Sequence, residues 1–359
     1  RSRDTSRASP TWPSGWTERF VGARAPYPYR EAMELAEARN GRGRCAAGAG
    51  ALLLMLVGCS AQVPPSDPVR EYVDEAVAAL QDGLYADTPE WEAALERIRP
   101  SLYEQPTIAD TYSGIAELGT VAGGRHTIFL TPEDVADYTR MYDDEAFALP
   151  TVSTDAGVST VTLPSFGGDE QASVDRYQDA GIDAVRSAAP TTTCGWVIDL
   201  RGNAGGNAYP MLVSVAPLLD DGHALGFQDR EGSTDWVDVD NGNLIVPPDY
   251  GIDTPTVDFS LSQPVAIVTG PDTSSAAETV VVAFATQADT FRIGDYTAGY
   301  TTGNESVTLR DGAVLAVSTS YYVDRTGTVY DGPIPPDSPR SAQSATVLDA
   351  AADWVESRC

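Results

Sequence analysis

Two serines lie in a turn between a short apolar run and a segment of helix-forming residues. The run "PVAIVTG" ends at Gly270, and "PDTSSAAET" follows it with Ser274 and Ser275. A serine at the start of a helix can act as a nucleophile, because the free N–H groups of the first helical turn stabilise a developing oxyanion. Serine is also a good N-cap, so the turn by itself leaves both interpretations open.

A serine nucleophile needs a base, and His and Lys are the usual ones. The chain contains no Lys and only two His, His126 and His223. His126 lies in "GGRHTIF", beside a Gly-rich turn, whereas His223 lies in the polar stretch "LDDGHALG". A neutral imidazole is suited to take a proton from a hydroxyl near pH 7. The two histidines are therefore the candidates for the general base, and a structural role beside the turn is the alternative for His126.

A second turn repeats the strand–loop–helix design of the serine turn. "GWVIDL" is typical of a buried strand, "RGNAGGN" of a Gly/Asn loop, and "YPMLVSVAPLL" of a helix. Glycines allow a backbone N–H to approach a reacting carbonyl closely, because no side chain stands in the way. The two turns together indicate a nucleophile and its oxyanion donors.

Four motifs occur in order along the chain: "VIDLRGNAGGN", "GPDTSSAAE", "GDYTAGYTTGN" and "YDGPIPPD". Over about residues 110–340 the chain thereby resembles the C-terminal processing (tail-specific) serine peptidases. The resemblance implies Ser275, three residues before Glu278, as the nucleophile. The main branch of that family has a Lys base where this chain has Tyr300, so a Ser–Lys dyad is excluded. The chain is more similar to the branch of the tricorn core and the retinoid-binding-protein repeats, which implies His126 as the base.

The resemblance also implies the other members of the site. The backbone N–H groups of Ala276 and Gly205, with Gly206 next in the chain, are the implied oxyanion donors. Asp331, in "YDGPIPPD", is the implied acid that orients the histidine. The segment between "GGRHTIF" and "VIDLRG" is too short for the PDZ domain that processing peptidases often carry.

Residues 1–58 are expected to be an upstream extension and a lipoprotein signal peptide. "RNGRGRCAAGAGALLLMLVGCS" has an Arg-bearing start and an apolar stretch too short to span a bilayer. "LVGC" resembles the lipobox of bacterial lipoproteins, which implies acylation of Cys59 and anchoring at the outer face of the cytoplasmic membrane. The alternative is a signal peptide that is cut elsewhere.

Charge and cysteine content narrow the possible partners. The formal net charge of −29 argues against nucleic-acid binding, because phosphates attract basic patches. We expect Cys194 and Cys359 to pair in an oxidising compartment outside the cell. No cluster of His, Cys and Asp has the spacing of a metal site and no phosphate-binding loop occurs. The sequence therefore predicts neither a metal nor another cofactor.

Repeated strand–strand–helix units predict an α/β fold of the crotonase (ClpP) type, in which helices pack on a sheet. We expect a tether at 59–68, a small helical subdomain at 69–125 and a peptidase core at 126–359. The predicted function is hydrolysis of exported peptides or proteins by a serine peptidase. The alternatives are a non-catalytic ligand- or peptide-binding module on the same fold, and a surface protein that binds cell-wall or peptide fragments.

Overall fold

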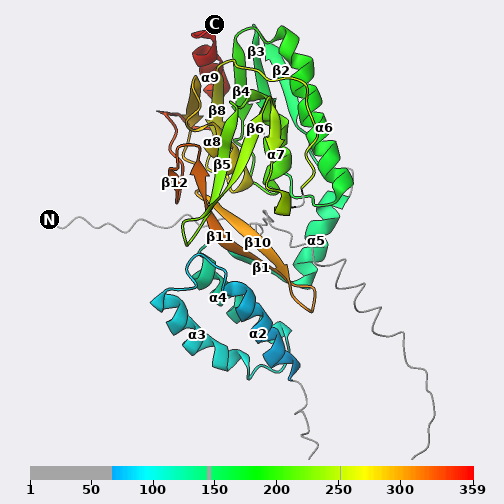
Figure 1. The fold of residues 1–359 in the computed structure, drawn as a ribbon, viewed down its shortest axis with the longest axis vertical. Helices are drawn as coiled ribbons and strands as arrows, with labels where there is room; N and C mark the ends of the chain where they lie inside the picture. The colour runs from blue at the N-terminus through cyan, green and yellow to red at the C-terminus, as the bar shows by residue number, and fades with distance from the viewer. Residues whose placement is uncertain (1–66, 144–146, 251) are drawn as a thin grey trace, which may run out of the picture.

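The computed structural model describes residues 67–143, 147–250 and 252–359 (Figure 1). The predicted signal peptide and Cys59, the predicted lipidation site, lie outside these residues. No helix within the described ranges is both long and apolar enough to cross a membrane. The described chain forms two β-sheets with packed helices, so the prediction of an α/β fold is confirmed.

One sheet has six strands in the spatial order β13-β9-β8-β4-β3-β2. In chain order they are β2 (Thr151–Asp155), β3 (Val158–Thr162), β4 (Gly195–Asp199), β8 (Val265–Thr269), β9 (Thr290–Gly294) and β13 (Ser338–Pro339). Strands β3, β4, β8 and β9 run parallel, and every residue of β4 and β8 is buried. Parallel strands that are covered on both faces are continuously apolar. Because β4 and β8 are parallel neighbours, the Gly-rich loop and the serine turn begin at the same edge of the sheet.

The second sheet has seven strands and is antiparallel. Its strands are β1 (Ile128–Leu130), β5 (Gly222–Asp229), β6 (Thr234–Asp240), β7 (Asn243–Ile245), β10 (Thr302–Thr308), β11 (Val314–Asp324) and β12 (Val329–Tyr330). The long strand β11 pairs with β1, β5, β10 and β12. It therefore connects the part of the sheet near the N-terminal helices with the rest of the molecule (Figure 1).

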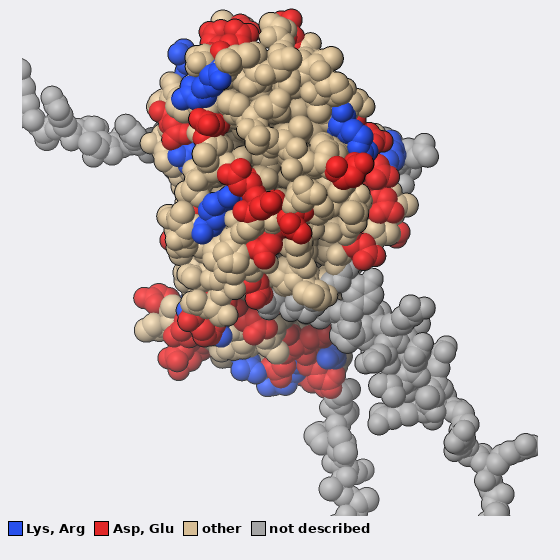
Figure 2. Space-filling view, turned by 45° about the horizontal axis from the view of Figure 1, so that its top comes forward, with Lys and Arg blue, Asp and Glu red and all other residues tan. Residues whose placement is uncertain are grey.

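Within the residues described from position 67 on, three α-helices precede the first strand: α2 (Pro68–Leu80), α3 (Pro89–Leu102) and α4 (Tyr112–Gly123). The side chains of Asp67 and Thr88 cap α2 and α3 by accepting backbone N–H bonds. The apolar faces of the helices share a buried cluster with the second sheet, in which Leu118 and Leu315 are members. Acidic side chains with a few Arg cover the surface in this lower part of the molecule (Figure 2). Because α4 packs on β11, the turn between α4 and β1 lies against the second sheet.

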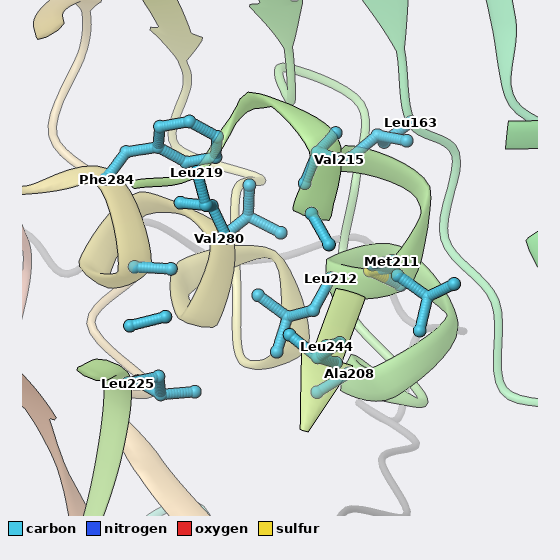
Figure 3. Close-up of a cluster of buried hydrophobic side chains, with 14 of the residues drawn as sticks. Leu163, Ala208, Met211, Leu212, Val215, Leu219, Leu225, Leu244, Val280 and Phe284 are labelled. Atoms are coloured by element: carbon cyan, nitrogen blue, oxygen red, sulfur yellow. The ribbon is translucent and has the colours of Figure 1, made fainter. Parts of the chain in front are cut away.

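The remaining helices are α5 (Pro132–Asp143), α6 (Gln171–Ala188), α7 (Ala208–Val215), α8 (Ala276–Phe284) and α9 (Val347–Glu356), with 3₁₀ turns at Ala109–Thr111, Ala189–Thr191, Ala216–Leu218 and Pro248–Tyr250. Every residue of α7 and α8 is buried. Both helices belong to a core cluster that includes residues of the two sheets. Figure 3 shows Val280 and Phe284 of α8 in this cluster with Leu212 of α7 and Leu225 of β5. A helix that is apolar on all sides must be buried on all sides. Helices α7 and α8 are buried in this way because they lie between the two sheets.

Helix α9 covers the opposite face of the parallel sheet. Its residues Val347, Ala351 and Val355 pack in one cluster with Val197 and Val268, which point away from α7 and α8. A disulfide joins Cys194, just before β4, to Cys359, just after α9, with 4.6 Å between the Cα atoms. The disulfide therefore attaches the C-terminal helix to a central strand.

We expect loss of this disulfide to lower the free energy of unfolding by about 2–4 kcal/mol, because the link closes a long loop in the unfolded chain. Urea unfolding of the wild type with and without reductant measures the effect. The Cys194→Ser/Cys359→Ser variant should match the reduced protein and should not respond to reductant. Equal midpoints for oxidised and reduced wild type would contradict the prediction.

Candidate active site

Ser275 lies at the turn between β8 and α8 in a strained conformation. Its backbone has φ 52° and ψ −116°, in the region that favours glycine, and its side chain is only 4% exposed. Hydrogen bonds hold the turn: the Thr273 hydroxyl donates to the Leu200 carbonyl over 2.8 Å, and the Ser274 N–H donates to the Asn203 carbonyl over 3.2 Å. Such strain persists only where the surroundings over-determine it, and it is concentrated at functional sites.

The carboxylate of Glu278, in the first turn of α8, is fully buried and is the main partner of the serine turn. Its Oε2 accepts the N–H groups of Ser275 and Tyr300 at 2.8 and 2.7 Å. Its Oε1 accepts the Gly299 N–H at 2.8 Å and the Thr297 hydroxyl at 2.5 Å. Burial raises the pKa of Glu278 to about 7, although these four bonds favour the charged form. One carboxylate thus joins the serine turn to the loop 297–300.

His126 lies in the turn between α4 and β1 and is 4% exposed. Its Nδ1 is 2.7 Å from the Thr302 hydroxyl, and its ring packs edge-on against Tyr300 with 5.1 Å between the centroids. Burial, together with the charge of Arg125, lowers the pKa of His126 to about 3. The imidazole is therefore neutral at neutral pH, as a general base must be.

His126 and Ser275 line the same small cavity of about 10 Å³, together with Gly206, Ala276 and Tyr322. This volume is that of about one water molecule. The residues come from four separate parts of the chain: the α4–β1 turn, the serine turn with the start of α8, the Gly-rich loop and β11. The fold thus brings the two residues singled out from the sequence to one enclosed space.

The N–H of Gly205, a predicted oxyanion donor, has another partner in the structure. Its N–H already donates to the Asn203 Oδ1 over 2.9 Å, because the loop folds back on its own asparagine side chain. An amide that is bonded in this way cannot stabilise an oxyanion in the cavity.

Gly206 is better placed than Gly205. The bridge to Phe166 uses the carbonyl of Gly205 and the N–H of Asn207, so the Gly206 amide is outside it. Gly206 has φ 122°, and a Cβ there would lie 2.1 Å from the Phe166 carbonyl oxygen. The position therefore requires glycine, and Gly206 lines the cavity together with Ala276.

The predicted orienting acid Asp331 does not take that role in the structure. The side chain that bonds the Nδ1 atom of His126 is the Thr302 hydroxyl, since β10 passes beside the α4–β1 turn. Asp331 is exposed after β12, where its charge contributes to the raised pKa of Tyr321. The predicted partner of the imidazole was a carboxylate, whereas the partner in the structure is the hydroxyl of Thr302, on β10.

Sequence reasoning missed Tyr322 and the role of Glu278. Tyr322, on β11, is 3% exposed; burial and the charge of Glu278 raise its pKa, and a hydrogen bond with Ser275 acts in the opposite direction. Nothing in "VSTSYYVD" distinguishes this tyrosine from its neighbours. Glu278 could have been found, because Ser-x-x-Glu at a helix start is the capping-box pattern.

The structure gives no indication of a metal in the part of the chain that it describes. Within residues 67–143, 147–250 and 252–359, no group of three His, Cys, Asp or Glu side chains is arranged to hold an ion. The functional side chains that line the cavity include those of Ser275, His126 and Tyr322.

We expect Glu278→Gln to lower the free energy of unfolding by about 2 kcal/mol, since the amide NH₂ would face two buried hydrogen-bond donors. Urea unfolding at pH 8, where the carboxylate is ionised, measures this change. The control is Glu356→Gln, which alters an exposed residue near the end of α9. Equal stability of Glu278→Gln and the control would mean that the four bonds do not hold the turn.

The chain is similar to several known proteins. The model of peptidase family S41 matches residues 157–339. The nisin-resistance protein of Lactococcus lactis subsp. lactis is 28% identical over 301 residues, which cover 82% of this chain and 89% of that protein. Carboxyl-terminal-processing peptidase 2, chloroplastic, of Arabidopsis thaliana is 27% identical over 180 residues, 47% of this chain and 32% of that protein.

Solved structures are similar over most of the chain. A lipoprotein from Streptococcus agalactiae has a TM-score of 0.70 at 25% identity, covering 87% of this chain and all of that one. The photosystem II D1 C-terminal processing protease has a TM-score of 0.57 at 15% identity, covering 81% and 98%, which shows a shared fold. The chain belongs to peptidase family S41 and is a serine-type peptidase.

Proposed function

We propose that Ser275 is the nucleophile and His126 the general base of a peptidase that cleaves exported peptides or proteins. The observation that carries the proposal is the cavity that both side chains line. The strained turn supports it, because a nucleophilic serine on a sharp strand-to-helix turn is a recurring feature of serine hydrolases.

The proposed reaction is acyl transfer. The Ser275 oxygen forms a bond to the peptide carbonyl carbon while His126 takes the hydroxyl proton. The N–H groups of Gly206 and Ala276 stabilise the oxyanion, and the N-terminal end of α8 adds a partial positive charge. His126 then gives the proton to the leaving amine, and a water molecule attacks the acyl-enzyme by the same steps.

Tyr322 is proposed to hold the serine hydroxyl in place. Its raised pKa keeps the phenol protonated, so it acts as a hydrogen-bonding group and not as a base. The alternative function, a non-catalytic binding module on the same fold, would need no reactive serine. Reactivity of Ser275 therefore distinguishes the two functions.

We expect a fluorophosphonate probe to label Ser275 in the wild type and to leave Ser275→Ala unlabelled. His126→Ala should label at least about 10³-fold more slowly, since the nucleophile loses its base. Ser274→Ala and His223→Ala are matched controls and should label like the wild type. Intact-protein mass spectrometry gives the rates. Unlabelled wild type would favour the binding module, and full labelling of His126→Ala would remove His126 as the base.

The acidic side chains of a groove beside the cavity favour a positively charged substrate. Phe227 lines both spaces. The groove has a volume of about 330 Å³, and its acidic side chains are Asp82, Asp229, Glu231, Asp235 and Glu305. The one basic lining residue, Arg230, donates to the carbonyls of Gln81 and Gly83 and pairs with Glu231 at 2.9 Å, so the acidic side chains of the groove outnumber its cation. We propose a cationic peptide, and nisin is the first to test, because one relative is named for resistance to it.

We expect peptides with Lys near the cleaved bond to have a lower KM than matched peptides with Glu. Asp82→Asn/Glu231→Gln should raise the KM of the Lys peptide about 3- to 10-fold, and added salt should narrow the preference. Glu356→Gln, far along the chain on α9, is the charge-matched control. A KM that is the same for Lys and Glu peptides at low salt would contradict the assignment.

We also propose that the chain is exported and held by a lipid on Cys59, at the outer face of the bacterial cytoplasmic membrane. The "LVGC" pattern supports this, as does the similarity to the Streptococcus agalactiae lipoprotein. Mass spectrometry of the mature N-terminus tests it. An acylated Cys59 is the expected result, and an unmodified mature protein would overturn it.

A further inference from the structure

A closed ring of hydrogen bonds starts and ends at His126. The Nδ1 atom of His126 is 2.7 Å from the Thr302 hydroxyl, which is 3.3 Å from the Ser318 hydroxyl. The Ser318 hydroxyl is 2.7 Å from the Asn304 Oδ1. The Asn304 Nδ2 is 2.8 Å from the backbone carbonyl oxygen of His126, which closes the ring. Asn304 and Ser318 are 2% and 0% exposed, so bulk water does not compete for these bonds.

The direction of every bond in this ring follows from its one unambiguous member. A carbonyl oxygen only accepts, so the atom of Asn304 that faces the His126 carbonyl is the NH₂ group. The amide oxygen then faces Ser318 and must accept the proton of that hydroxyl. Since the Ser318 proton is used, its oxygen accepts from Thr302.

The same logic reaches the imidazole. The Thr302 proton is directed to Ser318, so the Thr302 oxygen presents a lone pair to His126 and Nδ1 must carry the hydrogen. In this tautomer the lone pair is on Nε2, which is the nitrogen that can take a proton.

We propose that Asn304 is a positioning residue that fixes the tautomer of His126 through Ser318 and Thr302, with the hydrogen on Nδ1. Its consequence for activity rests on the proposed role of His126 as the base. In a Ser-His-Asp triad a carboxylate selects the tautomer. Here an uncharged amide does so at a distance, through two hydroxyls, without adding a charge beside the buried imidazole.

The strand register explains why these residues meet. Asn304 of β10 is directly opposite Ser318 of β11, and the register shifts between Gly303 and Asn304. Thr302 and Asn304 are two residues apart on β10, so their side chains lie on one face of the strand. The irregularity brings Ser318 to that face, in line with the use of bulges next to active sites. A Cβ at Gly303 would lie 2.5 Å from the Ser320 hydroxyl, so this close approach needs glycine.

The test is ¹⁵N NMR of the protein with its histidine side chains labelled. The ring ¹⁵N signals report which nitrogen of each histidine carries the hydrogen. The chain has only two histidines, so the exposed His223 serves as an internal reference. We expect a single Nδ1–H tautomer for His126 in the wild type. Ser318→Ala and Asn304→Leu should each produce an Nε2–H population, because Thr302 can then turn its proton toward Nδ1. Ser320→Ala, two residues along the same strand, is the matched control and should keep the wild-type spectrum.

Fluorophosphonate labelling of Ser275 in the same variants connects the tautomer to reactivity. We expect a loss of at least about 10-fold in Ser318→Ala, within the roughly 10⁴-fold seen when a triad histidine has the wrong tautomer. Ser318→Ala removes only one oxygen atom, so it remains a usable test variant if Asn304→Leu does not fold. An Nε2–H tautomer in the wild type, or an unchanged tautomer in Ser318→Ala, overturns the inference. A changed tautomer with unchanged labelling upholds the ring and overturns the base assignment.

Discussion

The site depends on the buried carboxylate of Glu278. Removing a carboxylate from water is costly, and it is tolerated here because four hydrogen bonds compensate for the lost solvation. Two of these bonds come from the N–H groups of Ser275 and Tyr300, in segments that are distant in sequence. The serine turn and the loop after β9 are therefore held to the first turn of α8, and the strained backbone of Ser275 is maintained by this constraint.

The histidine is held by a different part of the molecule. His126 follows α4, which packs on β11, and its ring bonds a residue of β10. The nucleophile belongs to the parallel sheet and its helices, whereas the base belongs to the antiparallel sheet. Helices α7 and α8, buried between the sheets, set the distance between these two layers. The geometry of the cavity is thus a result of core packing as well as of local turns.

Electrostatics at the cavity is largely that of neutral groups. Burial lowers the pKa of His126 to about 3 and raises that of Tyr322, so the imidazole and the phenol are both uncharged at neutral pH. The acidic side chains of the adjoining groove lie outside the cavity, whereas the charge of the buried Glu278 acts on Tyr322. This separation allows charge to act on the binding of a substrate while the proton transfer occurs among neutral partners.

The sequence by itself determined the α/β class, the buried strands β4 and β8, and the candidates Ser275 and His126. The strands have a local cause, since apolar runs bounded by Gly-rich turns predict them, and the absence of Lys excludes a lysine base. Ser275 and His126 were selected by the resemblance of four motifs to a peptidase family. Only the tertiary structure decided that Thr302 and not Asp331 bonds the histidine, that the Gly205 amide is already used, and that the chain forms a second sheet. Those outcomes depend on strand register and on the direction of single hydrogen bonds between distant segments, and no pattern of neighbouring residues encodes either.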